Sequence, residues 1–158
     1  MSETVIIAPH PDDEIIGCYD ILSNEFHNPI IVYTSEIAKE RQEETRKLRE
    51  VFPNIKIQMY CYNIPPNLLN NSNTFYFPHP TYELHPDHRM QGSIGENLAR
   101  QGIDVIFYST NMNAPFIHEV TTPNEKLRIL NEIYPSQSDL WKYDHKYFLF
   151  EGRCKWLF

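Results

Sequence analysis

The residues best suited to chemistry in this sequence lie in two short clusters of histidine and aspartate. The first cluster is Ala8-Pro9-His10-Pro11-Asp12-Asp13-Glu14, and the second is His85-Pro86-Asp87-His88-Arg89. His10 and Asp13 are three positions apart, and so are His85 and His88. Side chains at this spacing converge on one side of a helical turn, so each cluster can direct two ligands towards one point.

Together the clusters can supply the ligands of a catalytic metal ion. One histidine and one aspartate from the first cluster, with one histidine from the second, give the three ligands that a catalytic zinc uses beside water. The metal lowers the pKa of that water to about 7. Asp12 adjoins the ligand Asp13 but points elsewhere, so it is suited to accept the proton. Two histidines and one carboxylate also bind non-haem iron, so the residues alone leave Fe²⁺ open.

A simpler interpretation applies to each cluster alone. Acidic residues at helix starts commonly act only as caps that accept backbone N–H groups. Two separate His-Pro-Asp clusters, each at a predicted entry into a helix, favour a shared site over two independent caps.

The clusters depend on strands and helices that alternate along the chain. Apolar runs at 5–7, 30–33, 55–61 and 105–108 predict strands, and helices are predicted from residue 11 or 12 to 24 and at 37–52, 86–101 and 124–133. Residues 63–84 are predicted to be a loop before the third helix, and 141–158 give no clear pattern. Alternating elements imply a three-layer α/β domain with a mostly parallel sheet, spanning residues 1–158. Ligands bind at the carboxyl ends of such strands, where both clusters are expected.

At this point the sequence resembles a known family. The first cluster, followed by Gly17-Cys18, is similar to the signature of the PIG-L (LmbE-like) zinc deacetylases, and the second cluster is similar to that family's second motif. Weaker similarities are the Arg-and-Glu helix around 40–44 and the pair Ser136-Gln137. The resemblance implies a Rossmann-like fold, one zinc ion per chain and removal of N-acetyl groups, mostly from N-acetylglucosamine units in lipids, thiol cofactors or oligosaccharides.

The resemblance also implies roles for individual residues. The metal ligands would be His10, Asp13 and His88. Asp12 would be the general base that activates water and then returns a proton to the leaving amine. His85 would stabilise the oxyanion or act as the partner acid, with Asp87 orienting its imidazole.

The sequence departs from the family pattern at several positions. Tyr19-Asp20 replace a glycine pair, so close packing of the first helix must be achieved differently. Some members carry a mobile tyrosine two residues before the second motif, where this chain has Glu83, with Tyr82 one position further back. The chain is also shorter than most members, which leaves the substrate open.

Three residues outside the motifs are candidates for substrate binding. Arg41 shares a helical stripe with Ile37 and Leu48, so its guanidinium could reach the sheet edge and bind a sugar or phosphate, although an ion pair with a glutamate would explain it equally. Tyr82 and the aromatic residues at 75–77 could stack on a sugar, but packing over the core is favoured. His118 is expected in a loop after the fourth predicted strand, as a substrate contact or an ordinary exposed histidine.

Composition limits the classes of function. A net charge of −7 argues against a nucleic-acid backbone as partner, although a sugar-modified nucleic acid stays among the candidate substrates. No apolar run approaches the roughly 20 residues of a membrane helix, and no basic segment precedes an apolar one at the N-terminus. Three cysteines without a CxxC pair favour a reduced, cytoplasmic protein. Monomer and homo-oligomer both remain open.

The sequence therefore predicts a zinc-dependent N-deacetylase acting on an N-acetylated sugar or glycoconjugate. The main alternative is an inactive relative of the same fold that binds a glycan, which the intact clusters disfavour. A non-haem iron oxygenase would use the same ligands but normally has a β-barrel, whereas this chain is predicted to be α/β.

Overall fold

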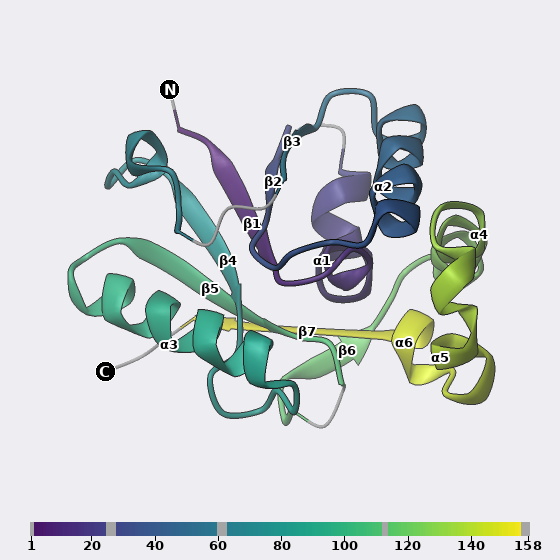
Figure 1. The fold of residues 1–158 in the computed structure, drawn as a ribbon. Coiled ribbons are helices and arrows are strands. Elements are labelled where there is room, and N and C mark those ends of the chain that lie inside the picture. The colour runs from purple at the N-terminus through teal and green to yellow at the C-terminus, as the bar shows by residue number, and fades with distance from the viewer. Residues whose placement is uncertain (1, 25–27, 60–62, 112–113, 156–158) are drawn as a thin grey trace.

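The computed structural model describes residues 2–24, 28–59, 63–111 and 114–155. Within these ranges seven strands form one sheet in the order β3-β2-β1-β4-β5-β7-β6 (Figure 1). They are β1 (Thr4–Ala8), β2 (Ile30–Tyr33), β3 (Lys56–Gln58), β4 (Thr74–Pro78), β5 (Asp104–Ser109), β6 (Ile117–Glu119) and β7 (Phe150–Lys155). Neighbours from β3 to β5 are parallel, whereas β7 is antiparallel to both β5 and β6. The chain is thus an α/β protein with a mostly parallel mixed sheet, as the sequence predicted.

Helices cover both faces of this sheet. They are α1 (Asp13–Ser23), α2 (Lys39–Val51), α3 (Pro86–Arg100), α4 (Pro123–Ile133), α5 (Ser138–Tyr143) and α6 (Lys146–Leu149), with 3₁₀ turns η1 (Pro66–Leu68) and η2 (Pro135–Gln137). Helix α3 packs on β4 and β5, while α1, α2 and α4 lie on the opposite face. Over the described residues, no helix combines the length and apolar character that crossing a membrane requires.

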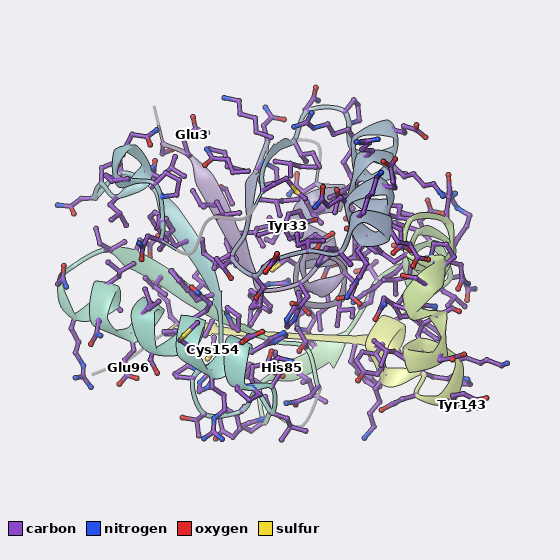
Figure 2. The ribbon with its side chains drawn as sticks, viewed as in Figure 1. Glu3, Tyr33, His85, Glu96, Tyr143 and Cys154 are labelled. Atoms are coloured by element: carbon purple, nitrogen blue, oxygen red, sulfur yellow. The ribbon has the colours of Figure 1, made fainter. Side chains whose placement is uncertain are left out.

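The central strands are buried on both sides, which explains their continuous apolar runs. In β1, Val5 and Ile7 face the layer of α3, whereas Ile6 and Ala8 face the layer of α1 and α4. The two-residue period of a strand thus divides the core into two clusters. Figure 2 shows Tyr33 enclosed between the sheet and its helices and Tyr143 directed outward, in agreement with exposed fractions of 0% and 79%.

The connections determine where a site can form. From the middle of the sheet, β1-α1-β2 proceeds in one direction and β4-α3-β5 in the other. Right-handed crossovers in opposite directions place α1 and α3 on opposite faces. The strand order therefore reverses between β1 and β4, and ligands bind beside the carboxyl ends of strands at such a point. The two histidine-containing clusters follow these two strands.

The prediction of a continuous loop over 63–84 is wrong, because this range contains β4 and η1. Strand β4 lies between β1 and β5 in the middle of the sheet. Its aromatic residues Phe75, Tyr76 and Phe77 are buried, so their predicted packing role is confirmed. A strand buried on both faces lacks alternation, and the surrounding prolines and asparagines resembled a loop.

The C-terminal segment without a clear pattern contains the end of α5, all of α6 and β7, while 156–158 lie outside the described residues. Glu151 in β7 is fully buried and pairs with Lys126 at 3.0 Å and with Arg153 at 2.6 Å. A strand with a buried ion-pair network gives no hydrophobic pattern, so it was missed. The predicted strand 55–61 is realised as β3, and its last two residues fall outside the described ranges.

Close packing of α1 depends on Gly17. A Cβ atom at Gly17 would lie 2.2 Å from the ring of Tyr108 in β5. Tyr108 in turn donates a hydrogen bond from its hydroxyl to the carbonyl oxygen of Ile7, at 2.5 Å. Gly17 thus provides the close approach of helix to sheet, although Tyr19 and Asp20 stand where the resemblance would place glycines.

Candidate metal centre

A cavity of about 340 Å³ opens where β1 leads into α1 and the β4–α3 connection enters α3. It is lined by His10, Asp12, Asp13, Ile16, Arg41, His85, His88, Thr110, Gln137, Leu140 and Tyr147. Both histidine-containing clusters therefore contribute to one hollow, as their expected position at the strand ends required. A larger hollow of about 520 Å³ lies between α1, α2 and α4, but its charged side chains Glu125, Arg128 and Glu132 already pair with one another.

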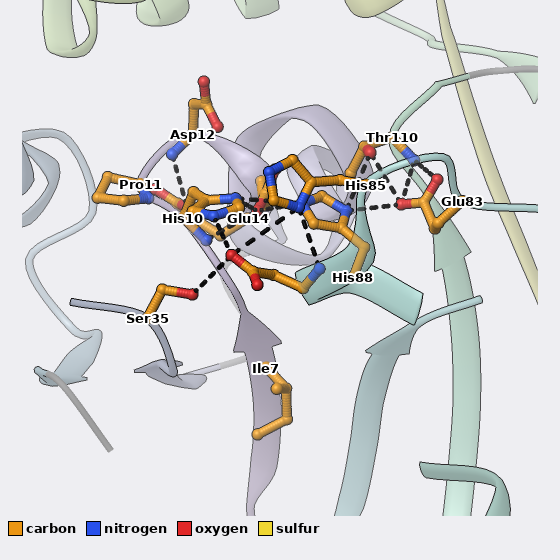
Figure 3. Close-up of polar contacts among 12 residues, drawn as sticks. Ile7, His10, Pro11, Asp12, Glu14, Ser35, Glu83, His85, His88 and Thr110 are labelled. Atoms are coloured by element: carbon orange, nitrogen blue, oxygen red, sulfur yellow. Dashed lines mark hydrogen bonds and ion pairs between the residues drawn. The ribbon is translucent and has the colours of Figure 1, made fainter. Parts of the chain in front are cut away.

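His10, Asp13 and His88 bring three ligand atoms together in this cavity. His10 Nδ1 lies 3.5 Å from Asp13 Oδ2 and 3.3 Å from His88 Nε2, and His88 Nε2 lies 3.0 Å from Asp13 Oδ2. Ligands about 2.0–2.1 Å from a tetrahedral zinc lie about 3.3 Å from one another. The three residues could therefore hold a metal ion. Figure 3 shows the imidazoles of His10, His85 and His88 gathered at the end of β1.

The charges around these atoms favour a cation. Burial lowers the pKa of His88, but the carboxylates of Asp13 and Glu83 outweigh it and raise the pKa to about 10. Burial likewise opposes the ionisation of Asp13, yet His88 and His10 hold the pKa of Asp13 below its ordinary value. Carboxylates that stabilise protonated imidazoles also stabilise a divalent cation in the same place, and metal binding displaces those protons.

Asp12 has a strained backbone at the entrance to α1. Its φ of 112° makes it the one residue other than glycine with positive φ among the described residues. The Asp12 N–H donates to Glu14 Oε2 at 3.1 Å, and the Asp12 carbonyl accepts from Ile15 and Ile16. Glu14 is itself buried and accepts a hydrogen bond from the Tyr134 hydroxyl. Such strain, of about 1–3 kcal/mol, persists where surrounding contacts fix the conformation.

The Asp12 side chain lines the cavity and is only 4% exposed. Burial, together with the adjacent Asp13 carboxylate, raises the pKa of Asp12 well above its ordinary value, and Arg41 opposes the shift. The nearest Arg41 nitrogen lies 3.5 Å from Asp12 Oδ2. A carboxyl group with a raised pKa beside a candidate metal centre can both accept and return a proton.

His85 and Asp87 lie at the start of α3, and Asp87 has a different partner from the one that the resemblance implied. His85 Nδ1 accepts a hydrogen bond from the Asp87 backbone N–H at 3.1 Å, and its distance to Asp87 Oδ2 is 3.8 Å. The Asp87 carboxylate lies closer to His10, with Oδ2 2.9 Å from His10 Nε2. The carboxylate of Asp87 therefore orients His10, whereas the backbone of Asp87 orients His85.

The three predicted substrate residues are placed differently. Arg41 reaches the cavity wall and donates to the carbonyl oxygen of Pro11. Tyr82 packs on His79 and Phe116 and is not among the residues that line the cavity. His118 was expected in a loop, which is wrong: it lies in β6, 3.5 Å from Asp20, and does not line the cavity either.

Two further groups of potential ligands occur among the described residues. His10, His85 and Asp87 form a more exposed set that shares His10 with the buried set. In the set Asp20, His118 and Glu151, the two carboxylates already pair with Arg153, at 3.6 and 2.6 Å. Charge compensation by Arg153 makes the latter a structural ion-pair network, so the buried set is the candidate metal centre.

Several residues of the site were not found from the sequence. Thr110 lines the cavity directly after β5, where the topology of a parallel sheet could have indicated it. Tyr147 comes from α6, in the segment whose pattern was unclear, and Leu140 comes from α5, one residue before that segment. Gln137 also lines the cavity, and its neighbour Ser136 donates its backbone N–H and hydroxyl to the Glu44 carboxylate, which ties η2 to α2.

His79 shapes the turn that leads from β4 to the second cluster. Its Nδ1 accepts hydrogen bonds from the backbone N–H groups of Thr81 and Tyr82, at 3.0 and 3.2 Å. If Nδ1 were protonated, it could no longer accept these two hydrogen bonds, and its N–H would face the two backbone N–H donors. Burial lowers the pKa of His79 below its ordinary value of 6.5, with Glu83 acting in the opposite direction.

We expect His79 to make the free energy of unfolding depend on pH. Because the folded-state pKa is the lower one, the unfolded chain binds more protons, and stability is lost as pH falls below about 6.5. In His79→Asn, the amide oxygen can replace Nδ1 as acceptor without titrating. Urea unfolding at several values between about pH 7 and pH 5 should show the wild type losing stability relative to H79N. Parallel curves for the two proteins would contradict this.

Neither a scan against protein-family models nor a search of curated proteins found a match to this chain.

Proposed function

We propose that this chain is a zinc-dependent N-deacetylase of the PIG-L (LmbE-like) type with a Rossmann-like fold. Its reaction would be hydrolysis of the N-acetyl amide of an amino-sugar substrate to acetate and a free amine. The observation that supports this most strongly is the convergence of His10 Nδ1, Asp13 Oδ2 and His88 Nε2 to within 3.0–3.5 Å of one another. His10 and His88, which contribute two of these atoms, are 78 residues apart in the sequence.

The donor set fits zinc, because two imidazoles and one carboxylate leave a position for water. When bound there, zinc would polarise the acetyl carbonyl and lower the pKa of water. Two of the three proposed ligands are oriented by further contacts. His10 Nε2 contacts Asp87 Oδ2, and Asp13 Oδ2 accepts a hydrogen bond from the His10 backbone N–H at 2.8 Å.

Asp12 carries the proton transfer in this proposal. It would accept a proton as water attacks the acetyl carbon and return that proton to the nitrogen as the C–N bond breaks. Its burial and raised pKa support both halves of this role, because the carboxyl group must be ionised first and neutral later. Arg41, 3.5 Å away, would limit the shift and keep the carboxylate available.

His85 would stabilise the oxyanion. Since its Nδ1 accepts from the Asp87 N–H, the proton of the neutral ring belongs on Nε2. The ring lines the cavity, so Nε2–H is a donor available to a substrate oxygen. A donor placed where negative charge develops is a major source of rate enhancement in acyl transfer.

The remaining walls offer contacts for a sugar. Arg41 and Gln137 provide donors, while Leu140 and Tyr147 provide apolar surface. Polar groups set among apolar and aromatic ones are typical of small-molecule sites. These residues support an N-acetylated sugar or glycoconjugate as substrate.

Acetate release from a panel of N-acetyl sugars tests the proposal. The panel should contain free N-acetylglucosamine, a nucleotide-linked form, a chito-oligosaccharide and a glycolipid. We expect at least one compound to release acetate, the activity to fall more than about 100-fold on chelation, and zinc to restore it. Full activity in protein shown by mass spectrometry to be metal-free would refute a metal-dependent mechanism. Metal binding and glycan binding without acetate release would instead support an inactive glycan-binding protein.

A further inference from the structure

We propose that Glu83 is a positioning residue that holds the His88 imidazole with Nε2 facing the metal position. This inference rests on the proposed metal centre. Glu83 comes from the connection between β4 and α3, is 1% exposed, and its Oε1 lies 3.1 Å from His88 Nδ1. Figure 3 shows its carboxylate directed towards both His88 and Thr110.

The neighbours of Glu83 supply donors to its carboxylate. The Thr110 backbone N–H lies 3.0 and 3.1 Å from the two oxygens, and the Thr110 hydroxyl donates to Oε1 at 2.8 Å. The Ser109 hydroxyl adds a longer contact of 3.5 Å to Oε2. A carboxylate surrounded by donors acts as an acceptor, so the hydrogen bond with His88 must be donated by Nδ1–H.

This direction of the hydrogen bond determines what His88 can do. With the proton on Nδ1, the lone pair of the neutral ring is on Nε2. That atom faces Asp13 Oδ2 at 3.0 Å and His10 Nδ1 at 3.3 Å. A histidine ligand that donates its second nitrogen to a carboxylate is fixed in tautomer and orientation and becomes a better ligand.

Glu83 also connects two elements that the site must hold in register. It bridges the end of β5, through Ser109 and Thr110, to the first turn of α3, through His88. The Thr110 hydroxyl lies 3.4 Å from the same Nδ1, but it already donates its proton to Glu83. Glu83 is therefore the stronger of the two hydrogen-bond partners of His88 Nδ1, and it also orients the Thr110 hydroxyl.

Zinc affinity of Glu83→Gln is the decisive measurement. Glutamine has nearly the same shape, but only one of its two terminal atoms is an acceptor. Its NH₂ group must therefore face a donor from Thr110 or His88, and at least one hydrogen bond is lost. Loss of such a partner typically weakens metal binding by about 10–100-fold. Zinc affinity is measured by competition with a chromophoric chelator, and the matched control is Glu96→Gln in α3, where Glu96 forms an exposed ion pair with Arg100 at 2.8 Å.

We expect E83Q to bind zinc about 10–100-fold more weakly than the wild type and E96Q to bind it normally. A Co²⁺-loaded E83Q protein should also show a changed visible absorption spectrum, which a general loss of stability would not produce. Wild-type zinc affinity together with an unchanged cobalt spectrum in E83Q would overturn the role of Glu83. If E83Q fails to fold, Glu83→Asp, which keeps the charge but shortens the reach, takes its place under the same two criteria. Failure of the wild type itself to bind zinc would contradict the metal centre instead, so the two failures are distinguishable.

Discussion

Replacing Asp12 by asparagine should lower kcat for acetate release by about 10²–10⁴-fold while one zinc ion per chain is retained. Asparagine preserves the size of the side chain but cannot accept a proton from water. Asp12 is not among the three residues whose ligand atoms converge, so the metal should stay bound. Steady-state kinetics give kcat, and elemental analysis of the purified variant gives the metal content.

Asp20→Asn is the matched control, because Asp20 lies in α1, which begins directly after Asp12, and does not line the cavity. It removes one negative charge from the ion-pair network with Arg153, outside the cavity, and should leave kcat within a factor of about two. An Asp12→Asn enzyme with nearly normal turnover would show that another group accepts the proton.

His88→Ala should have a different effect, because this variant loses the metal. Only His10 and Asp13 would remain of the three converging ligands. The loss of zinc affinity should therefore exceed the about 10–100-fold typical of removing a residue that merely orients a ligand. Activity should fall with metal occupancy and recover in part at high zinc concentration. Isothermal titration with zinc and activity at graded zinc concentrations measure the two quantities together.

His118→Ala serves as the control for His88→Ala. His118 lies in β6, 3.5 Å from Asp20, and does not line the cavity. Zinc affinity and kcat should both match the wild type. Tight zinc binding by His88→Ala would mean that another set, such as His10, His85 and Asp87, holds the metal.

The candidate centre could be predicted because its chemistry is concentrated in short motifs. His10 and Asp13 come from one motif and His88 from the other. The two motifs follow β1 and β4, which are parallel neighbours, so their carboxyl ends lie at the same edge of the sheet. Glu83 was noticed only as the residue at a tyrosine position. Its function depends on Ser109 and Thr110, which are more than twenty residues away, and nothing in the local sequence connects them.

The strand order was harder to predict than the class of fold. Because β4 was not predicted, no predicted strand preceded the second motif. Its position beside β1 then had to be attributed to a loop over residues 63–84. In the structure β4 pairs directly with β1, which places its carboxyl end beside that of β1. Strand β7 was missed for another reason. Its residue Glu151 is buried and pairs with both Lys126 and Arg153, whereas hydropathy alone predicts no charge in a buried strand.

The positive φ of Asp12 sets stability against the proposed catalytic role of its side chain. Glycine adopts positive φ without steric cost, so Asp12→Gly would relieve the local strain and remove the proposed proton acceptor in a single substitution. A population screened only for heat resistance would tend to accumulate this change and lose turnover, as expected where activity and stability conflict. Retention of aspartate at this position under such a screen would show that the positive φ costs little stability, and its loss would leave a protein without the proposed proton acceptor.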